Sequence, residues 1–437
     1  MATDVREKSY LDTLLEAQGR PPAGSPSFLS ELRADALEHA NALRVPTTRD
    51  EDWRFTDLSP LYRTSFPAAH APAALIESAI APFVVSEAHS RLVFVDGFFA
   101  PEFSVVHADG GITIASLASA LATQNERVRA QLGKVVDFRK DPFAAVNTAW
   151  LRDAAVVLVD EGTSVERPIH ILFLGATPGT AAYPRVLIAA EADSRCTVVE
   201  EFASLHGESG FTNGVSEILL GENASLRHVR LQQESSAAFH IATCRMLLAR
   251  GAKCSSVSVA LGARLSCYNV GVVQGGEGAD WQLDGVAVIS GRQLADTHSV
   301  FDHGAAHGRS RQLHKCIAGG AAHAVFNGKI LVRPGAQQTD SGQQSRNLLL
   351  SDRASIDTKP ELEIFADDVK CAHGATVGQL DAEQVFYLKS RGLSDASSRN
   401  LLTFAFAAEV VERIAIPSLV ARIEDFVLKQ TQSKESQ

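Results

Sequence analysis

Residues 218–224 read Ile218-Leu219-Leu220-Gly221-Glu222-Asn223-Ala224: three apolar residues, three turn-forming residues and a small one, followed by a polar alternating strand. Looser copies of this pattern recur along the chain, and the small residue falls at Thr163, Ala192, Ala224, Ala252, Ala336 and Ala354. These positions lie 29, 32, 28, 84 and 18 residues apart. The first three intervals agree and 84 is three times 28, whereas the last interval does not fit.

A repeat of about 20–50 residues indicates stacked supersecondary units. Each unit here contains strands and turns but no helical stretch, which favours a β-helix in which every coil pairs its backbone with the next. A β-sandwich with strands of even length is the alternative fold. In the β-helix we expect four inward-facing leucines to stack into one continuous core: Leu187, Leu219, Leu248 and Leu349.

Helical periodicity flanks this repeat on both sides. It covers residues 8–18 and 27–43 before the repeat, 116–132 inside the strand-rich part, and 381–392, 394–414 and 417–429 after it. Asp381 is placed to cap the helix at 381–392 and Gly392 to end it. The expected apolar stripe of the helix at 394–414 consists of Leu401, Leu402, Phe404, Ala405, Ala408, Val411 and Ile414.

These patterns predict a mainly β fold with three regions. They are an N-terminal helical domain at residues 1–90, a β-helix core at 91–373, and a C-terminal helical domain at 374–437.

Composition excludes several classes of partner. The chain of 437 residues has a net charge of −10, and binding to phosphates needs clustered Lys and Arg, so we expect no nucleic-acid partner. The longest apolar runs, such as 154–159, are far shorter than the ~18 residues that would span a bilayer. Residues 1–8 mix charges and offer no apolar signal-peptide core. We expect no membrane partner and a bacterial cytosol as the location.

Catalytic motifs are absent from the sequence, which has no P-loop, no His-Glu-x-x-His and no Gly-x-Ser-x-Gly. Adjacent acids such as Glu200-Glu201 and Asp367-Asp368 point to opposite faces of a strand and make a poor general acid/base pair. The chain is therefore not expected to be an enzyme.

Six cysteines are scattered without a Cys-x-x-Cys pair, which is typical of free thiols in a reducing cytosol. Five of them are expected to be small core residues: Cys196, Cys244, Cys254, Cys267 and Cys316. The sixth stands in Cys371-x-His373, where a thiolate and an imidazole two residues apart face the same side of a strand. That pair suits a soft metal or an iron–sulfur cluster, with the remaining ligands supplied by another subunit.

Six of the fourteen histidines lie between residues 298 and 373: His298, His303, His307, His314, His323 and His373. Their spacing is irregular, so only the fold could bring them together as a metal site. Polar ladders and turn contacts on β-coils are the favoured interpretation. The sequence leaves the roles of His298, His303, His307 and His314 open.

Several stretches together resemble the SufB/SufD family of the SUF iron–sulfur cluster assembly system. They are 51–58 (EDWRFTDL), 325–330 (VFNGKI), 336–340 (AQQTD), 347–351 (NLLLS), 359–364 (KPELEI), 367–376 (DDVKCAHGAT), 386–388 (FYL) and 390–392 (SRG). Within the family, residues 371–378 (CAHGATVG) resemble the SufD form, because SufB-type chains usually carry Glu on both sides of the histidine. Trp53 is expected to staple its segment onto the neighbouring domain.

The resemblance implies a right-handed parallel β-helix flanked by helical regions, in a scaffold subunit of the SufB–SufC–SufD complex. SufB would pair with the β-helix, and the SufC ATPase would dock on residues 374–437 through Phe386, Tyr387, Arg391, Gly392 and Phe404. Cys371 and His373 would lie at the SufB interface as metal ligands shared with SufB, with His373 the stronger candidate. No cofactor would be held stably by the chain alone, and a nascent iron–sulfur cluster would form at that interface.

Other interpretations stay open on the sequence. A homodimer in the absence of SufB and a mature plastid protein are both compatible with the resemblance. A SufB-type primary scaffold would accept sulfur itself and carry a persulfide on Cys267 or Cys371. An unrelated β-helix enzyme acting on carbohydrate would need paired acids and Arg on one face of successive coils. A purely structural interaction protein would bind no ligand.

Overall fold

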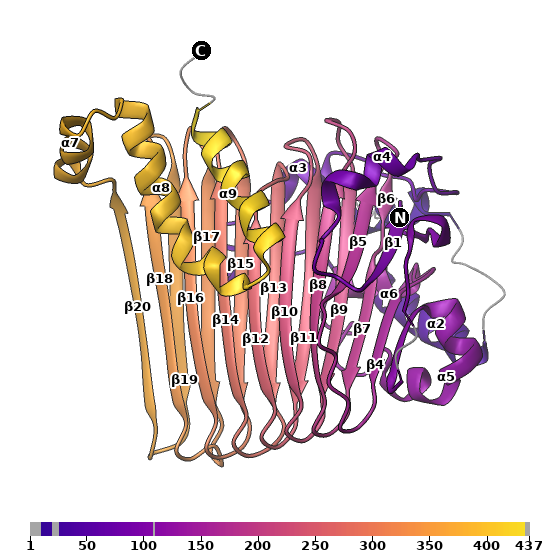
Figure 1. Cartoon of the computed structure of the whole chain (residues 1–437). Coiled ribbons are helices and arrows are strands. Elements are labelled where there is room, and N and C mark those ends of the chain that lie inside the picture. The colour runs from indigo at the N-terminus through magenta and orange to yellow at the C-terminus, as the bar shows by residue number, and fades with distance from the viewer. Residues whose placement is uncertain (1–9, 20–25, 108–109, 433–437) are drawn as a thin grey trace, which may run out of the picture.

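The computed structural model describes residues 10–19, 26–107 and 110–432, and these residues form two facing sheets of ten strands each (Figure 1). The first sheet has the order β2 (Phe98–Phe99), β1 (Ser90–Val95), β5 (Ile169–Gly175), β8 (Arg195–Ser204), β10 (Ser225–Gln233), β12 (Lys253–Ala260), β14 (Asp280–Ile289), β16 (Arg309–Ala318), β18 (Asp340–Leu349) and β20 (Lys370–Gln379). The second sheet has the order β19 (Ser355–Ile364), β17 (His323–Val332), β15 (Leu294–His303), β13 (Leu265–Gln274), β11 (Phe239–Leu248), β9 (Phe211–Leu220), β7 (Arg185–Ala190), β4 (Ala155–Val159) and β3 (Ile112–Ser116), with β6 (Ala181–Ala182) beside β9.

From β7 to β20 successive strands alternate between the two sheets, and each strand pairs in parallel with the strand one coil away. In the first sheet the register runs through Ser225, Lys253, Asp280, Arg309, Asp340 and Lys370, so successive coils take 28, 27, 29, 31 and 30 residues. The predicted parallel β-helix is therefore confirmed and the β-sandwich is excluded. The handedness of the coil stays a prediction.

The corners between the sheets explain the sequence repeat. Ala224, Ala252 and Ala336 follow strands of the second sheet, and all three are fully buried. Ala354 instead follows β18 of the first sheet, so the 18-residue interval that did not fit leads from one corner to the opposite corner of the solenoid.

The interior between the sheets is lined by alternate residues of each strand, and the prediction of its leucines was half right. Leu248 lies in the main interior core, and Leu349 also faces inward, in register with Ala318, but packs in a smaller interior cluster. Leu187 and Leu219 pack instead outside the second sheet. Because side chains alternate along a strand, an alignment shifted by one residue moves a side chain to the other face.

Helices cover the outer faces of both sheets. They are α1 (Tyr10–Ala17), α2 (Ser27–Ala42), α3 (Ser59–Tyr62), α4 (Glu77–Ile80), α5 (Leu117–Gln131), α6 (Pro142–Ala149), α7 (Ala382–Ser390), α8 (Asp395–Val411) and α9 (Pro417–Gln432), with 3₁₀ turns η1 (Glu51–Trp53), η2 (Ala81–Phe83), η3 (Pro101–Phe103) and η4 (Glu412–Ile414). Helices α1, α2, α3, α5 and α6 pack on the second sheet, and α4, α8 and α9 pack on the first (Figure 1). No helix in the described ranges is long and apolar enough to cross a membrane.

The predicted helices are confirmed within a few residues, except that residues 8 and 9 lie outside the described residues. Asp381 caps α7 by accepting a hydrogen bond from the Glu383 N–H, and Gly392 follows it with a φ of 95°. The stripe predicted for α8 was partly wrong, since Leu401 is exposed while Thr403 and Ala407 are buried. This helix is apolar on most sides, so periodicity alone does not select its buried face.

One of the two predicted boundaries between regions, at residue 373, falls inside a strand. Strand β20 continues to Gln379, beyond the predicted boundary at residue 373, and the first helix after it begins at Ala382. The division of the chain into domains at residues 90 and 373 stays a prediction.

A buried ion pair fixes α6 and the loop before it to the second sheet. Arg185 of β7 and Glu217 of β9 are both fully buried and bonded to each other. Glu217 also accepts the backbone N–H groups of Gly133 and Val135 at 2.9 and 3.1 Å. Arg185 donates to Asn147 of α6 at 3.1 Å.

Replacing Arg185 should therefore destabilise the fold. Arg185→Met leaves the Glu217 carboxylate buried without its cation, which costs about 3–5 kcal/mol. Arg250→Met is the matched control: it breaks a pair with Glu222 in which both side chains are more than half exposed, and such pairs contribute at most ~1 kcal/mol. Thermal unfolding followed by circular dichroism measures both, and equal shifts in the two midpoints would contradict the role given to the buried pair.

Candidate functional site

The two ends of the solenoid differ. At the first end, β2 and β3 pair antiparallel with β1 and β4 and close the sheets. At the other end β19 and β20 are the edge strands. Every residue of β19 is at least partly exposed, and in β20 every residue except the partly exposed Cys371 is exposed. In the described part of the chain nothing covers this edge, and β20 stands beyond β18 (Figure 1). We call β19 and β20 with their inward side chains the open end.

Cys371 and His373 both lie on the inward side of β20 at this open end. Their register partners on β18 are Ser341 and Gln343, which are buried in the solenoid interior. The Cys371 side chain packs partly against the interior core, whereas His373 is exposed. The structure thus confirms that the two side chains share one face, at the rim of the last coil.

Two hydrogen-bonded rows inside the solenoid lead to these two residues. In the first row, His303 Nε2 lies 2.9 Å from the Ser310 hydroxyl, and Ser310 lies 2.6 Å from the Ser341 hydroxyl, which is in register with Cys371. In the second row, the Ser299 hydroxyl donates to Gln312 Oε1 at 2.9 Å, and Gln343 Nε2 donates to the same oxygen at 2.8 Å. The interior below Cys371 and His373 is therefore polar.

The cysteines differ sharply in accessibility. Five are buried and Cys371 alone is partly exposed. Burial raises the pKa of the Cys196, Cys254 and Cys316 thiols to about 12 and that of Cys267 well above its ordinary value. Burial also raises the pKa of the Cys371 thiol. Cys267 is thus a poor sulfur acceptor, and Cys371 must release a proton before it can bind a metal.

The histidines do not converge. His314 stacks on Phe326 at 4.5 Å, and burial lowers its pKa to about 3. Burial likewise lowers the pKa of His303 to about 4. His298 lies on the outer face of the second sheet with Asp296, and His323 pairs with Asp357. Among the described residues no group of three or more His, Cys, Asp or Glu is placed to hold a metal ion. The sharing of Cys371 and His373 as metal ligands therefore stays a prediction.

Glu200 and Glu201 behave as predicted, whereas Asp367 and Asp368 lie in the bend between β19 and β20 and not on a strand. Glu200 faces the interior, where His228 Nε2 lies 3.1 Å from its carboxylate. Glu201 faces outward to Arg422 of α9 at 2.6 Å. The two carboxylates therefore do not share a site.

The residues predicted for docking an ATPase lie on α7, just after its end and on α8. Phe386 and Tyr387 of α7 are 73% and 56% exposed, and the Arg391 guanidinium lies 5.2 Å from the centre of the Tyr387 ring. Phe404 of α8 is half-buried against the cluster that joins α8 to the first sheet, so only part of its ring faces solvent. The structure thus brings Phe386, Tyr387, Arg391 and Gly392 together on one protruding segment and sets Phe404 apart.

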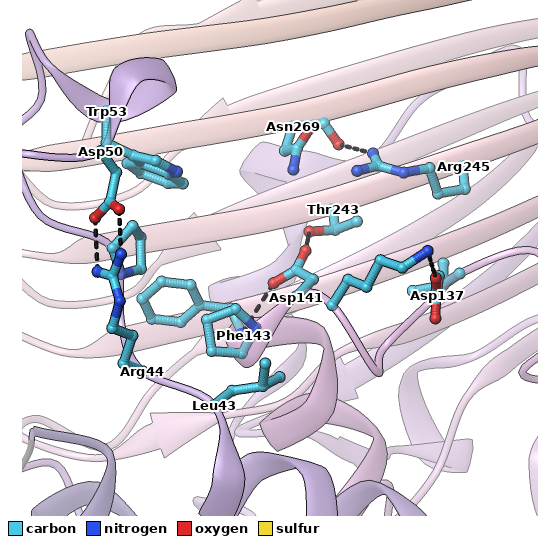
Figure 2. A pocket seen from close by; sticks show the side chains of 14 residues that line it. Leu43, Arg44, Asp50, Trp53, Asp137, Asp141, Phe143, Thr243, Arg245 and Asn269 are labelled. Atoms are coloured by element: carbon cyan, nitrogen blue, oxygen red, sulfur yellow. Dashed lines mark hydrogen bonds and ion pairs between the residues drawn. The ribbon is translucent and has the colours of Figure 1, made fainter.

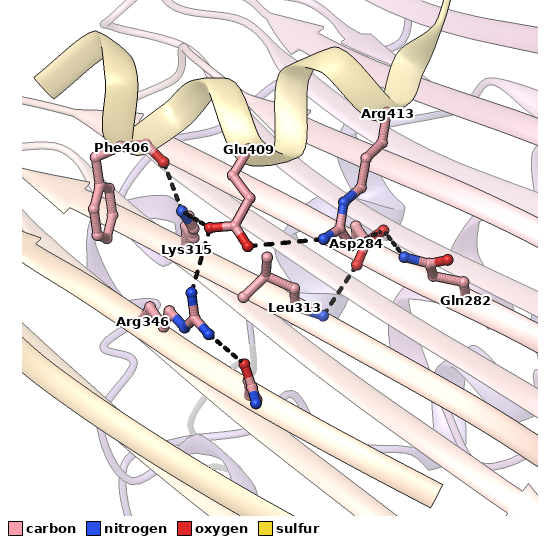
Figure 3. Close-up of polar contacts among 9 residues, drawn as sticks. Gln282, Asp284, Leu313, Lys315, Arg346, Phe406, Glu409 and Arg413 are labelled. Carbon is pink, nitrogen blue, oxygen red and sulfur yellow. Dashed lines mark hydrogen bonds and ion pairs between the residues drawn. The ribbon is translucent and has the colours of Figure 1, made fainter. Parts of the chain in front are cut away.

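Charged residues tie α8 to the first sheet (Figure 3). Lys315 of β16 is almost fully buried and donates to the Glu409 carboxylate at 2.6 Å and to the Phe406 carbonyl at 2.7 Å. Arg346 of β18 reaches the same carboxylate at 3.4 Å. Arg413 pairs with Asp284 of β14 at 2.8 Å. A movement of α8 would therefore be transmitted to three strands, and β18 is the neighbour of β20.

The segment at 51–58 also reaches the open end. The Trp53 ring packs on His298 at 5.1 Å, and the Thr56 hydroxyl donates to Asp296 at 2.6 Å. Lys359 of β19 donates to the Glu51 carboxylate at 2.9 Å. These contacts confirm the predicted staple, and they extend it to the last strand of the second sheet.

A separate cleft of about 510 Å³ lies between this segment, the loop before α6 and the second sheet (Figure 2). The three acidic residues that line the cleft already have partners. Asp50 pairs with Arg44, and Asp137 pairs with Lys140 at 3.0 Å. Asp141 accepts hydrogen bonds from the N–H of Phe143 and the hydroxyl of Thr243, each at 2.9 Å. No residue predicted for the site lines this cleft.

Sequence reasoning missed the residues beneath the open end. Ser341 and Gln343 stand 30 residues before Cys371 and His373, which is one coil. Applying the repeat length to the Cys-x-His pair would have found them. Lys315 and Glu409 carried no such signal, because only the packing of α8 brings them together.

Comparisons with known proteins agree with this architecture. Residues 173–406 match the family described as SUF system FeS cluster assembly, SufBD core domain, and residues 4–171 match the SufBD protein N-terminal region. An iron–sulfur cluster assembly SufBD family protein of Synechocystis is 40% identical over 95% of this chain and 94% of its own length. The iron–sulfur cluster assembly protein SufD of Escherichia coli is 32% identical over 85% of each chain, and a chloroplastic protein of Arabidopsis thaliana, ABCI7, is 32% identical over 88% of this chain and 82% of its own. The chain therefore belongs to the SufBD family of iron–sulfur cluster assembly proteins and is of the SufD type.

Proposed function

We propose that this chain is the scaffold subunit of a SufB–SufC–SufD complex and pairs with a SufB-type chain through its open end. The observation that carries the proposal is the uncovered last coil, whose two strands are both edge strands. Ile364 on β19, Phe365 just after it and Val377 near the other end of β20 are exposed apolar residues of this coil. Unpaired edges accept an added strand, so a second solenoid end would satisfy the backbone and cover these side chains together. A bacterial cytosol or a plastid stroma would suit such a complex, and the relatives include both a bacterial and a chloroplastic protein.

The nascent cluster is the cargo of the complex and not a resident cofactor. Cys371 and His373 supply at most two ligands, so the partner supplies the others. His373 is the stronger candidate because its ring is exposed, whereas the Cys371 thiol is half-buried with a raised pKa. The chain itself contributes position and ligands, which agrees with a non-enzymatic scaffold.

A SufC-type ATPase would dock on α7. Exposed aromatic residues beside Arg are the usual anchors of an interface, and Phe386, Tyr387 and Arg391 provide them on a helix that projects past the sheets (Figure 1). ATP binding would act by favouring one of two packings of the interface. The Lys315–Glu409–Arg346 contacts would carry that change from α8 to the strand beside β20.

The two proposed interfaces can be separated by mutation. Mixed with SufB-type and SufC-type proteins from the same source, the wild-type chain should form a stable complex with one copy of itself and two of SufC. Phe386→Asp should lose the SufC contact and keep SufB, while Phe365→Asp should do the reverse, because each removes an exposed anchor worth at least ~2 kcal/mol. Light scattering gives the mass of each product.

Each variant is the control for the other. Loss of both partners in both variants would indicate misfolding, which circular dichroism of the isolated chain detects. A wild-type chain that stays alone would contradict the proposal. A chain that replaces SufB and accepts sulfur on Cys371 would favour the primary-scaffold alternative.

The coupling through α8 can be tested by cross-linking Cys371 to the partner in the assembled complex. The yield should differ with and without ATP in the wild type, and Lys315→Met should reduce the difference because it breaks the closest of the links to Glu409. Lys429→Met is the control, since it breaks an exposed pair with Asp425 on α9. Equal yields with and without ATP in the wild-type complex would contradict this mechanism.

A further inference from the structure

One buried acceptor beneath the open end has no partner. The side chain of Gln343 on β18 is only 2% exposed, and its Oε1 is buried without a hydrogen bond in the described structure. A buried amide oxygen left unpaired costs about 1–3 kcal/mol. We therefore expect a hydrogen-bond donor for this oxygen, and the side chains around it limit where that donor can lie.

The other end of the same amide is already fixed. Gln343 Nε2 donates to Gln312 Oε1 on β16 at 2.8 Å, and Gln312 is held in turn by the Ser299 hydroxyl at 2.9 Å. Gln312 and Gln343 are register partners, and the register partner of Gln343 on the opposite side is His373. With the β16 side occupied, His373 is the inward residue of the next coil that can supply an N–H.

Gly328 of β17 lies across the interior from β18 and leaves space for the Gln343 amide. A Cβ at position 328 would overlap the Nε2, Cδ and Oε1 atoms of Gln343. The φ of Gly328 is not in the left-handed region, so the backbone conformation does not require a glycine at this position. The glycine instead leaves room for the Gln343 side chain. This explains a glycine in the VFNGKI stretch at 325–330 that the proposed interface does not otherwise use.

We propose that Gln343 is the positioning residue for His373. Its Oε1 accepts one ring N–H of His373, which fixes the tautomer and orientation of the imidazole and leaves the lone pair of the other ring nitrogen for the cluster iron. Metal-binding histidines commonly have such an acceptor on their second nitrogen. This inference rests on the proposed function, because it takes His373 to be a ligand of the nascent cluster.

The test uses the assembled SufB–SufC–SufD complex carrying a reconstituted and reduced cluster. Pulsed electron paramagnetic resonance detects the hyperfine coupling of an imidazole nitrogen bound to the cluster. We expect this signal in the wild type, its loss or a marked change in Gln343→Leu, and its recovery in Gln343→Glu, which keeps an acceptor oxygen. Ser345→Ala is the matched control: Ser345 lies inward on the same strand but is in register with Ala375. It should leave the signal unchanged.

The outcomes separate the two levels of the proposal. If His373→Ala keeps the imidazole signal, His373 is not the ligand and the proposed function of this residue fails. If His373→Ala removes the signal but Gln343→Leu leaves it as in the wild type, the role of Gln343 alone is overturned. The mass of every complex is measured in parallel, because Gln343→Leu must assemble as Ser345→Ala does. If Gln343→Leu loses the signal together with assembly while Ser345→Ala keeps both, Gln343 acts through stability and its positioning role is overturned.

Discussion

Backbone pairing between successive coils governs this molecule. A strand in a solenoid satisfies its N–H and C=O groups with the coil before it and the coil after it, so the first and last coils each leave one row unpaired. The two ends of the solenoid differ in how this row is covered. Short antiparallel strands and the packing of α5 close the first end, whereas β19 and β20 stay uncovered in the described residues. The predicted site residues lie on this unpaired coil, and the proposed partner would complete it.

The interior changes character from one end to the other. Near the first end Phe94, Phe173 and Phe202 stack with ring centres 5.0 and 5.1 Å apart. Near the open end the corresponding space holds polar side chains such as Gln312, Gln343 and Ser341. Buried polar groups cost stability unless they are bonded, and an apolar filling would stabilise the last coils more. Stability of the fold therefore does not explain the polar rows that lead to Cys371 and His373, whereas the chemistry proposed for these two residues would.

Much of this architecture could be predicted from the sequence because its signals are local. The corner residues Ala224, Ala252 and Ala336 recur at the length of a coil, and the alternation of a strand places Cys371 and His373 on one face. The face of a strand that turns inward could not be predicted from isolated leucines, since Leu187 and Leu248 sit at similar points of the repeat yet lie on opposite faces. The contacts of Lys315 with Glu409 and of Trp53 with His298 join residues far apart in the chain. No local pattern encodes them, and only the packing of the helices on the sheets creates them.

The central claim, that the open end is the interface, is tested most directly by hydrogen exchange of the backbone amides with and without a SufB-type partner. In the free chain the amides of residues 355–364 and 370–379 that point away from β17 and β18, along the free edge of each sheet, should exchange quickly. The structure gives these amides no strand to pair with. Adding the partner should slow exchange at those residues and leave β1 to β4 unchanged. Slower exchange on the N-terminal helices or at β1 to β4, with β19 and β20 unaffected, would contradict the account.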